Sequence, residues 1–478
     1  MSRPRRAVAH VRTFLGDSLT PVAAYRRLAA DRPRFLFESV TGGEQVSRYS
    51  FLGGAPRALY RLYPDRLEVE DAAGRRSLGG PPLARLRETL GAIVAEPGPV
   101  PFAGGFVGYF GYDLARLAER LPASPPDPFG LPVALLARID SLLVFDHAHQ
   151  RLLAVANEIE GEVDREAAAA ELDRLEALLA GVRTAGAERL PAPPPGAVAA
   201  PSLSGPEYRA AVERAQRHIE RGDVFQVVLA RRFPLGPAVD ATTLYRALRT
   251  INPSPYMVLV EMPEVALVGA SPEMLVRKTG RRLETRPIAG TRRRGATAGE
   301  DERLARELLA DAKERAEHVM LVDLGRNDLG RVAEGGSVRV ASFMEIERYS
   351  HVMHLCSTVE ATLASGRGAL DVLLACFPAG TVSGAPKIRA MEIVDELEPE
   401  ARGPYAGAIG YVSFAGDLDA CIAIRTLVIH DGEVSVTAGA GIVADSRPES
   451  EQLETESKAA ALLAAVELAR GLEASSQP

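Results

Sequence analysis

The 478-residue sequence contains no tryptophan, and aromatic side chains make up only 5% of it. Proteins that bind single-stranded nucleic acid stack the bases on aromatic rings, so this shortage argues against that function. A formal net charge of −7 argues against a general nucleic-acid binder too, because such proteins need a basic surface to neutralise phosphates. The composition therefore disfavours nucleic acid as a partner.

Cysteine is also scarce, and long apolar runs are missing. Cys356, Cys376 and Cys421 are odd in number, widely spaced and set in apolar surroundings, which is typical of buried thiols and not of a disulfide framework or a zinc site. The basic residues 1–6 are not followed by the apolar core of a signal peptide. No run reaches the length of a membrane-spanning helix. We therefore expect a cytoplasmic protein.

A proline-rich stretch divides the chain. With 46% hydrophobic residues, the sequence can bury a large core in two or three domains. Residues 186–205 have the composition of a linker, so we expect an N-terminal region over 1–185 and a catalytic domain over 206–470. Beyond the linker, strands and helices mix without the regular alternation of a doubly wound fold, which favours the α+β class.

Hydrophobic periodicity and capping residues predict the main elements. We expect helices over 21–30, 164–182, 206–221 and 300–322, and strands over 35–40, 48–52, 104–111, 142–146, 152–156, 224–230 and 434–438.

One stretch near the end of the chain combines glycines with acidic residues. Gly439 and Gly441 flank Ala440 directly after the last predicted strand, and a charged helix carrying Glu451 and Glu454 follows. Glycines let backbone N–H groups approach an anion, and carboxylates three residues apart share a helix face that can bind a hard cation. An ordinary solvated helix after a glycine turn has the same pattern.

A second acidic pair weighs against that ordinary interpretation. Glu314 and Glu317 share one face of the helix predicted over 300–322. Two such pairs, each beside an apolar run and a basic residue, favour a divided carboxylate site for Mg²⁺. The glycines also match a permissive dinucleotide-binding pattern, but residues 445–448 interrupt the position where its phosphate-facing helix should begin.

Other polar residues occur where an anionic substrate could be recognised. Glu273 follows an apolar strand, and residues 286–292 form a glycine turn with hydroxyl and guanidinium groups suited to carboxylates. Arg425 stands in a buried-type strand, where an unpaired guanidinium is costly and an anionic partner would help. Residues 380–387 are expected to form an exposed polar turn. Each pattern is also compatible with an ordinary surface turn or strand end.

Two histidines complete the set of candidates. His351 and His354 lie three residues apart on a predicted strand, so their side chains should face opposite sides. At most one of them can belong to a site.

Five motifs occur in a recognisable order, at 287–292, 314–318, 322–328, 380–387 and 439–443. Together they resemble the chorismate-utilising enzymes, and within them the large subunits of anthranilate synthase. The resemblance covers about residues 203–465 and is weaker in the N-terminal region. It implies a large layered α+β fold of sheets and helices, with the N-terminal region packed closely on the catalytic region. It also implies a Mg²⁺-dependent lyase that converts chorismate and ammonia to anthranilate and pyruvate, the first committed step of tryptophan biosynthesis.

The resemblance assigns roles to individual residues. Mg²⁺ would bind Glu317 and Glu454, with Glu314 and Glu451 in support. Glu273 would protonate the departing C4 hydroxyl, which requires a protonated and therefore desolvated carboxyl group. His354 would act when pyruvate leaves, and His351 would be structural. Chorismate would contact Gly290, Thr291, Thr381, Tyr405, Arg425, Gly439, Ala440, Gly441 and Lys458, the last also balancing the charge of the carboxylates.

A feedback pocket for tryptophan is implied by two N-terminal motifs and one central motif. Phe37 replaces the more usual leucine in the first of them. The pocket residues would be Glu38, Ser39, Arg48, Tyr49, Ser50, Asn252, Pro255, Tyr256 and Met257.

Gln226 and Ala289 bear on the choice of nucleophile. Isochorismate and salicylate synthases carry a lysine base where Gln226 stands; glutamine cannot activate water, so ammonia is the expected nucleophile. Aminodeoxychorismate synthases often carry a lysine nucleophile in place of Ala289. Because the three cysteines lack the glycine-flanked context of a glutaminase, the resemblance implies a separate glutamine amidotransferase subunit. An aminodeoxychorismate synthase of folate biosynthesis and a non-catalytic tryptophan-sensing subunit remain alternatives.

Overall fold

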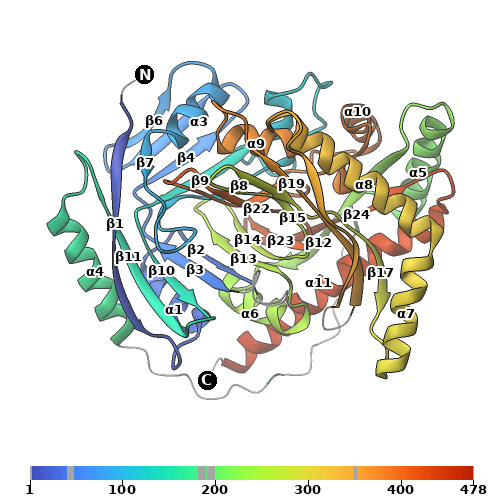
Figure 1. Ribbon diagram of the computed structural model, residues 1–478. Helices are drawn as coiled ribbons and strands as arrows, with labels where there is room; N and C mark the ends of the chain where they lie inside the picture. Colours follow the sequence, from blue (N-terminus) through green and yellow to red (C-terminus); the bar gives the residue numbers. More distant parts are fainter. Residues whose placement is uncertain (1–2, 40–47, 181–189, 191–199, 349–351, 477–478) are drawn as a thin grey trace.

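The computed structural model describes residues 3–39, 48–180, 190, 200–348 and 352–476. Within these residues, two large sheets pack face to face between two outer layers of helices (Figure 1). The α+β class with large layered sheets is therefore confirmed. The predicted linker 186–205 lies mostly outside the described residues.

The first sheet has twelve strands among the described residues, all antiparallel to their neighbours except the pair β1 and β7. Its order is β20 (Gly384–Ala385), β12 (Gln226–Pro237), β24 (Glu433–Ile442), β23 (Thr426–His430), β14 (Ala266–Ser271), β13 (Tyr256–Glu261), β2 (Arg34–Glu38), β3 (Tyr49–Gly54), β10 (Ser141–Asp146), β11 (Arg151–Ile159), β1 (Arg5–Leu15) and β7 (Ile93–Ala95).

The second sheet also has twelve strands in the described part of the chain. Its order is β17 (Ile288–Arg293), β19 (Val352–Thr362), β16 (Arg282–Thr285), β15 (Met274–Thr279), β22 (Leu418–Ile422), β21 (Ala408–Ser413), β8 (Gly105–Phe110), β9 (Ala134–Ile139), β4 (Ala58–Leu62), β5 (Leu67–Asp71) and β6 (Gly74–Leu78), while β18 (Arg339–Arg348) pairs with β19 outside this path.

Strands from both sides of the predicted linker complete each sheet. In the first sheet, β2 pairs with β13, and in the second, β8 pairs with β21. The apolar layer between the sheets accordingly contains Phe35 and Val107 from the N-terminal half together with Leu267 and Ile409 from the C-terminal half. The two halves therefore share one core between the sheets.

Helices cover the outer faces of both sheets, because each helix has an apolar side that must be buried. The first sheet packs against α1 (Pro21–Arg27), α4 (Arg165–Ala180), α6 (Ala241–Ile251) and α11 (Pro448–Ser476). The second packs against α3 (Pro82–Leu90), α8 (Ala312–Gly330) and α9 (Ala369–Cys376), and α5 (Gly205–Glu220) and α10 (Lys387–Leu397) enclose a smaller core beside β12. The remaining helical segments are α7 (Ala298–Ala310) and the 3₁₀ turns η1 (Leu28–Ala30), η2 (Tyr112–Leu117) and η3 (Gly380–Val382).

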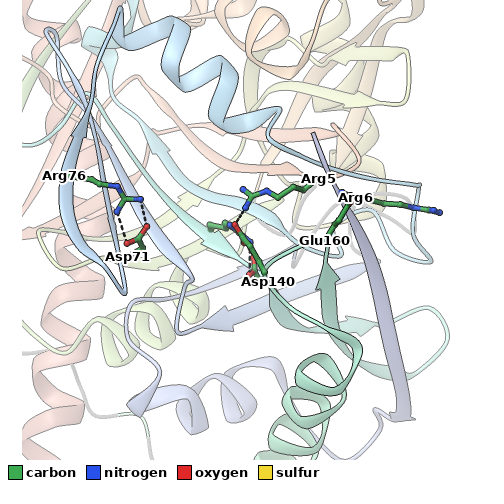
Figure 2. A network of polar contacts seen from close by, with 8 residues as sticks. Arg5, Arg6, Asp71, Arg76, Asp140 and Glu160 are labelled. Atoms are coloured by element: carbon green, nitrogen blue, oxygen red, sulfur yellow. Dashed lines mark hydrogen bonds and ion pairs between the residues drawn. The ribbon is translucent and has the colours of Figure 1, made fainter. Parts of the chain in front are cut away.

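Figure 2 shows charged side chains near the N-terminal strands of both sheets. Arg76 on the edge strand β6 donates two hydrogen bonds to Asp71 on β5, at 2.9 and 2.8 Å. The guanidinium of Arg76 lowers the pKa of Asp71 to about 2. On β1, the backbone N–H of Arg6 donates to Glu160 at 3.3 Å. Because β6 is the edge strand of the second sheet, the charge of Arg76 opposes pairing of this edge with another chain.

Three local predictions are wrong. The helix predicted over 300–322 is two helices, because the Asp311 carboxylate caps α8 by accepting from the N–H groups of Lys313 and Glu314 at 3.0 and 3.2 Å. Residues 380–387 form a largely buried link instead of an exposed turn. The glycines near the end of the chain lie inside β24, which continues to Ile442, and not in a turn.

No helix in the described part of the chain is both long and apolar enough to cross a membrane.

Candidate active site

Glu273 lies where the chain crosses from the first sheet to the second, between β14 and β15. Thr381 from η3 donates its hydroxyl hydrogen to Oε1 of Glu273 at 3.1 Å. Burial raises the pKa of the Glu273 carboxyl to about 8, and the hydrogen bond from Thr381 opposes this rise. At neutral pH the side chain is therefore mostly a neutral acid, the state that the sequence-based role requires.

A second crossing between the sheets carries Arg425, in the connection from β22 to β23. It was expected within a strand, but its backbone has a φ of 49°, in the left-handed region that non-glycine residues rarely adopt. The guanidinium is half-buried and has no hydrogen bond or ion pair within the described residues, and burial lowers its pKa. An unpaired cation in this position is suited to an anionic ligand.

The two crossings are tied together. The Ser271 hydroxyl, at the end of β14, donates to the backbone carbonyl of Ile422 at 2.7 Å. The N–H of Ile422 in turn donates to the carbonyl of Glu273 at 3.0 Å. The acid and Arg425 are therefore held on neighbouring strand ends.

His354 faces the paired strand β17, where Gly290 has a φ of 63° and produces a bulge. The His354 Nδ1 atom lies 3.0 Å from the Gly290 carbonyl oxygen and 3.1 Å from the Thr291 hydroxyl. Because a carbonyl oxygen can only accept, Nδ1 carries the proton in the neutral ring and the lone pair is on Nε2. Burial is the main cause that lowers the His354 pKa, and nearby Arg425 lowers it further. His351 lies outside the described residues.

The two acidic pairs lie on different helices, Glu314 and Glu317 on α8 and Glu451 and Glu454 on α11. Burial raises the pKa of Glu317, and the negative charges of Glu314, Glu454 and Glu451 raise it further. The four carboxylates are thus electrostatic neighbours although they are far apart in the sequence. Lys458 donates to Glu454 at 2.7 Å and to the Gly439 carbonyl at 2.8 Å.

The described residues contain no group of three or more metal-ligating side chains already arranged around one point. The acidic residues nevertheless fit a magnesium ion chemically, because Mg²⁺ prefers carboxylate oxygens and the repulsion felt by Glu317 would be relieved by a cation.

Gly439 and Gly441 make room for two polar side chains. A methyl group on Gly439 would lie 2.7 Å from the Tyr405 hydroxyl oxygen, and one on Gly441 would lie 2.6 Å from Nε2 of Gln226. Gln226 is buried, and its Oε1 atom has no hydrogen-bond partner among the described residues. Glycine is therefore required here by side-chain proximity in an extended strand. Ala440, which lies between the two glycines in the strand, is fully buried.

The family model for chorismate-binding enzymes matches residues 33–464. The chain belongs to the chorismate-binding enzyme family.

Named relatives match this sequence over nearly its full length. Anthranilate synthase component 1 from Thermus thermophilus is 50% identical over 467 residues, which cover 96% of this chain and 97% of the relative. The protein of the same name from Streptomyces coelicolor is 47% identical, over 98% of this chain and 90% of the relative. This similarity does not favour the folate-pathway alternative.

Solved structures show the same architecture. The crystal structure of anthranilate synthase component I from Streptococcus pneumoniae aligns with a TM-score of 0.80 and 37% identity, over 95% of this chain and 99% of that one. The menaquinone-specific isochorismate synthase MenF from Escherichia coli aligns with a TM-score of 0.69 at 19% identity, over 98% of this chain and 96% of that one, and shows likeness of fold alone.

The residues predicted for the tryptophan pocket mostly line a cavity of about 1410 Å³ between the sheets. Ser50 and Asn252 are not in its lining; Ser50 instead lies 2.7 Å from Nε2 of His147. The Ser39 hydroxyl is buried without a partner among the described residues. The cavity is lined by Glu38, Ser39, Arg48, Tyr49, Pro255, Tyr256 and Met257 among others.

Sequence reasoning missed several contacts in the site. Arg292 was grouped with residues suited to a substrate carboxylate, but it binds the protein's own Asp311 and Glu314, at 2.9 and 3.1 Å. Lys387 and Asp328, from two separate motifs, form a buried ion pair at 3.0 Å. The sequence motifs include Arg292, Lys387 and Asp328, but nothing in the spacing of the motifs indicated which residues these three would bind.

Proposed function

We propose that this chain is the chorismate-aminating component of an anthranilate synthase, which converts chorismate and ammonia to anthranilate, pyruvate and water. The observation that carries the proposal is Gln226, buried beside Gly441 in a chain 50% identical to an anthranilate synthase component 1. An amide has no basic lone pair with which to activate water, whereas ammonia is already a nucleophile.

Chorismate would be held by groups that complement its two carboxylates. Arg425 supplies a cation without another partner in the described residues, and Tyr405 places its hydroxyl beside Gly439. Burial raises the pKa of Tyr405 to about 12, so the hydroxyl stays a neutral donor. Gly290 and Thr291 lie at the bulge of β17, and the Gly290 carbonyl contacts Nδ1 of His354.

The first step uses Glu273 as a general acid. As the ammonia nitrogen bonds to C2, the two ring double bonds shift and the C4–O bond breaks. The proton of Glu273 passes to the departing hydroxyl, which leaves as water. The added nitrogen then gives its extra proton to solvent and Glu273 regains one from solvent, which restores the acid and the total charge.

The second step removes the enolpyruvyl group. Loss of the C2 proton and cleavage of the C3–O bond aromatise the ring and release enolpyruvate, which takes up a proton to become pyruvate. His354 is assigned to this step, since its neutral ring presents a lone pair on Nε2. The lowered pKa of His354 keeps its ring neutral at neutral pH.

Magnesium is part of the proposal. Glu317 and Glu454 would hold the ion, with Glu314 and Glu451 in support, and Glu454 would exchange its contact with Lys458 for the ion. A bound Mg²⁺ neutralises and polarises the ring carboxylate of chorismate.

The remaining assignments follow from the same proposal. A separate glutamine amidotransferase subunit supplies the ammonia. Tryptophan binds in the cavity between the sheets, where the unpartnered Ser39 hydroxyl and apolar neighbours suit an amino acid with an indole ring. Both regions line that pocket, 1–185 and 206–470 in nearly equal share, and 206–470 also supplies the chorismate site. We place the enzyme in the cytoplasm, where its substrate would be made.

The test is a direct assay of the purified chain with chorismate, Mg²⁺ and ammonium. We expect fluorescent anthranilate and an equal amount of pyruvate, inhibition by tryptophan, and little activity with glutamine until the partner subunit is added. Accumulation of a non-aromatic amino product would contradict the proposal in favour of an aminodeoxychorismate synthase. Tryptophan binding without any turnover would indicate a sensing subunit.

A further inference from the structure

Thr381 has a neighbour that its sequence-based role does not explain. It was expected to contact chorismate, yet its hydroxyl donates to Oε1 of Glu273 at 3.1 Å. Within the described residues this carboxyl oxygen is the only recorded hydrogen-bond acceptor of the Thr381 hydroxyl. If the Thr381 hydroxyl instead accepted a hydrogen bond from the protonated Glu273, the hydrogen of the Thr381 hydroxyl would lose Oε1 as its acceptor.

Thr381 is also the side-chain group that restrains the acid. The backbone of Glu273 is fixed on both sides, by the N–H of Ile422 at 3.0 Å and by the Ser271 hydroxyl at 3.4 Å. The Glu273 carboxyl itself has no hydrogen bond recorded within the described residues except that from Thr381. Without this bond the carboxyl can rotate and place its proton on either oxygen.

We propose that Thr381 is a positioning residue for the acid: by donating to Oε1 it confines the proton of Glu273 to Oε2, the oxygen left to face the C4 hydroxyl of chorismate. The inference rests on the proposed function and deepens it. A neutral carboxyl carries its proton on one oxygen and accepts on the other, so a fixed donor at Oε1 selects Oε2 as the acidic site. Delivery of the proton to the leaving group then needs no rotation of the acid.

Among the described residues, no neighbouring charge takes over this task. Asp328 and Cys376 line a small cavity of about 40 Å³ beside Glu273, but Asp328 is paired with Lys387 at 3.0 Å. Burial raises the pKa of Cys376 and of nearby Cys356, so both thiols stay neutral at neutral pH. The protonation of Glu273 is thus governed by its burial and by Thr381.

The chain offers a matched control for the experiment. Thr285 lines the same small cavity, but its hydroxyl donates to the carbonyl of Leu275 at 3.0 Å and does not contact Glu273. Thr381→Val and Thr285→Val make the same chemical change in the same surroundings. Thr381→Ser keeps the hydroxyl and serves as the rescue variant.

Steady-state kinetics with chorismate, Mg²⁺ and ammonium provide the first readout. For Thr381→Val we expect kcat to fall roughly 10- to 100-fold, part of the contribution that general acids make, with the KM for chorismate within about twofold of the original. The alkaline limb of kcat/KM should move to higher pH, because the lost hydrogen bond favoured the ionised carboxyl. Thr381→Ser should recover most of kcat, and Thr285→Val should change neither value.

A second readout does not depend on turnover. The C=O stretch of protonated Glu273, obtained as the infrared difference from Glu273→Gln, should shift to higher frequency in Thr381→Val because Oε1 loses its donor. If Thr381→Val is unstable, the same band is measured in Thr381→Ala. A raised KM with unchanged kcat, equal effects of Thr381→Val and Thr285→Val, or an unshifted band would each overturn the inference. Failure of the unaltered chain to form anthranilate would instead contradict the proposed function.

Discussion

The hydroxyl of Tyr256 donates a hydrogen bond of 3.1 Å to Oδ1 of Asp419 and thereby joins a strand of the first sheet to a strand of the second. Arg277 completes the contact, donating to the Tyr256 oxygen at 3.1 Å and to Asp419 at 2.9 Å. Tyr256, Arg277 and Asp419 all line the cavity proposed for tryptophan. Arg277 lies on β15, the strand that begins directly after Glu273, and Asp419 lies on β22, the strand that precedes Arg425. The cavity proposed for tryptophan and the two crossings therefore share β15 and β22.

Removing that hydroxyl should weaken inhibition. In Tyr256→Phe the ring still fills the cavity wall, but the tie between the sheets is lost, at a cost of about 1 kcal/mol in stability. We expect the tryptophan concentration for half-inhibition to rise severalfold, measured in the ammonium-dependent assay. Tyr60→Phe is the control, because Tyr60 lies on β4 and does not line the cavity. Unchanged inhibition would show that the tie plays no part.

The activity should decline as the pH rises through about 8. The folded-state pKa of Glu273 is raised to about 8, so the protonated acid predominates below that pH and is lost above it. Glu273→Gln should lower kcat roughly 100- to 10,000-fold and remove this alkaline limb, with chorismate binding retained in equilibrium titrations. An alkaline limb that persists in Glu273→Gln would assign it to another group.

The metal requirement can be tested on a single carboxylate. Glu317→Gln keeps the size of the side chain but removes one negative charge from the four carboxylates of α8 and α11. We therefore expect the Mg²⁺ concentration for half-maximal activity to rise at least tenfold. Calorimetric titration with Mg²⁺ should show the same loss. Glu307→Gln, on the exposed side of α7 and paired only with Arg303 among the described residues, should leave the Mg²⁺ dependence unchanged. A chelator should abolish the activity of the unaltered chain.

Gly439 should not tolerate even a methyl group. In Gly439→Ala the new carbon would lie 2.7 Å from the Tyr405 hydroxyl and 2.9 Å from the Leu229 carbonyl, so the strand or the tyrosine must move. We expect an increase of at least tenfold in the KM for chorismate and a loss of roughly 1–3 kcal/mol in unfolding free energy. Gly299→Ala, with open space around it on α7, should be neutral or slightly stabilising. A normal KM in Gly439→Ala would remove this strand from the substrate site.

Local patterns predicted the elements well where their causes are local. The hairpin of β10 and β11 was expected from two apolar runs around a short polar turn, and the helix after Pro206 from its apolar face and the glycine that follows it. The division at Asp311 was missed although aspartate is a common N-cap, because the helical composition on both sides masked the break. Arg425 was placed in a strand because its neighbours are apolar, but the chain leaves one sheet there and enters the other.

The sequence by itself determined the residue types of the site and most of the strands and helices that carry them, because periodicity, caps and motif chemistry act over a few neighbouring positions. Only the tertiary structure decided the partners. Thr381 meets Glu273 across 108 positions, and the carboxylates of α11 come near enough to α8 to raise the pKa of Glu317, because two shared sheets bring distant segments together. Such contacts depend on how whole sheets pack, which no short stretch of sequence encodes.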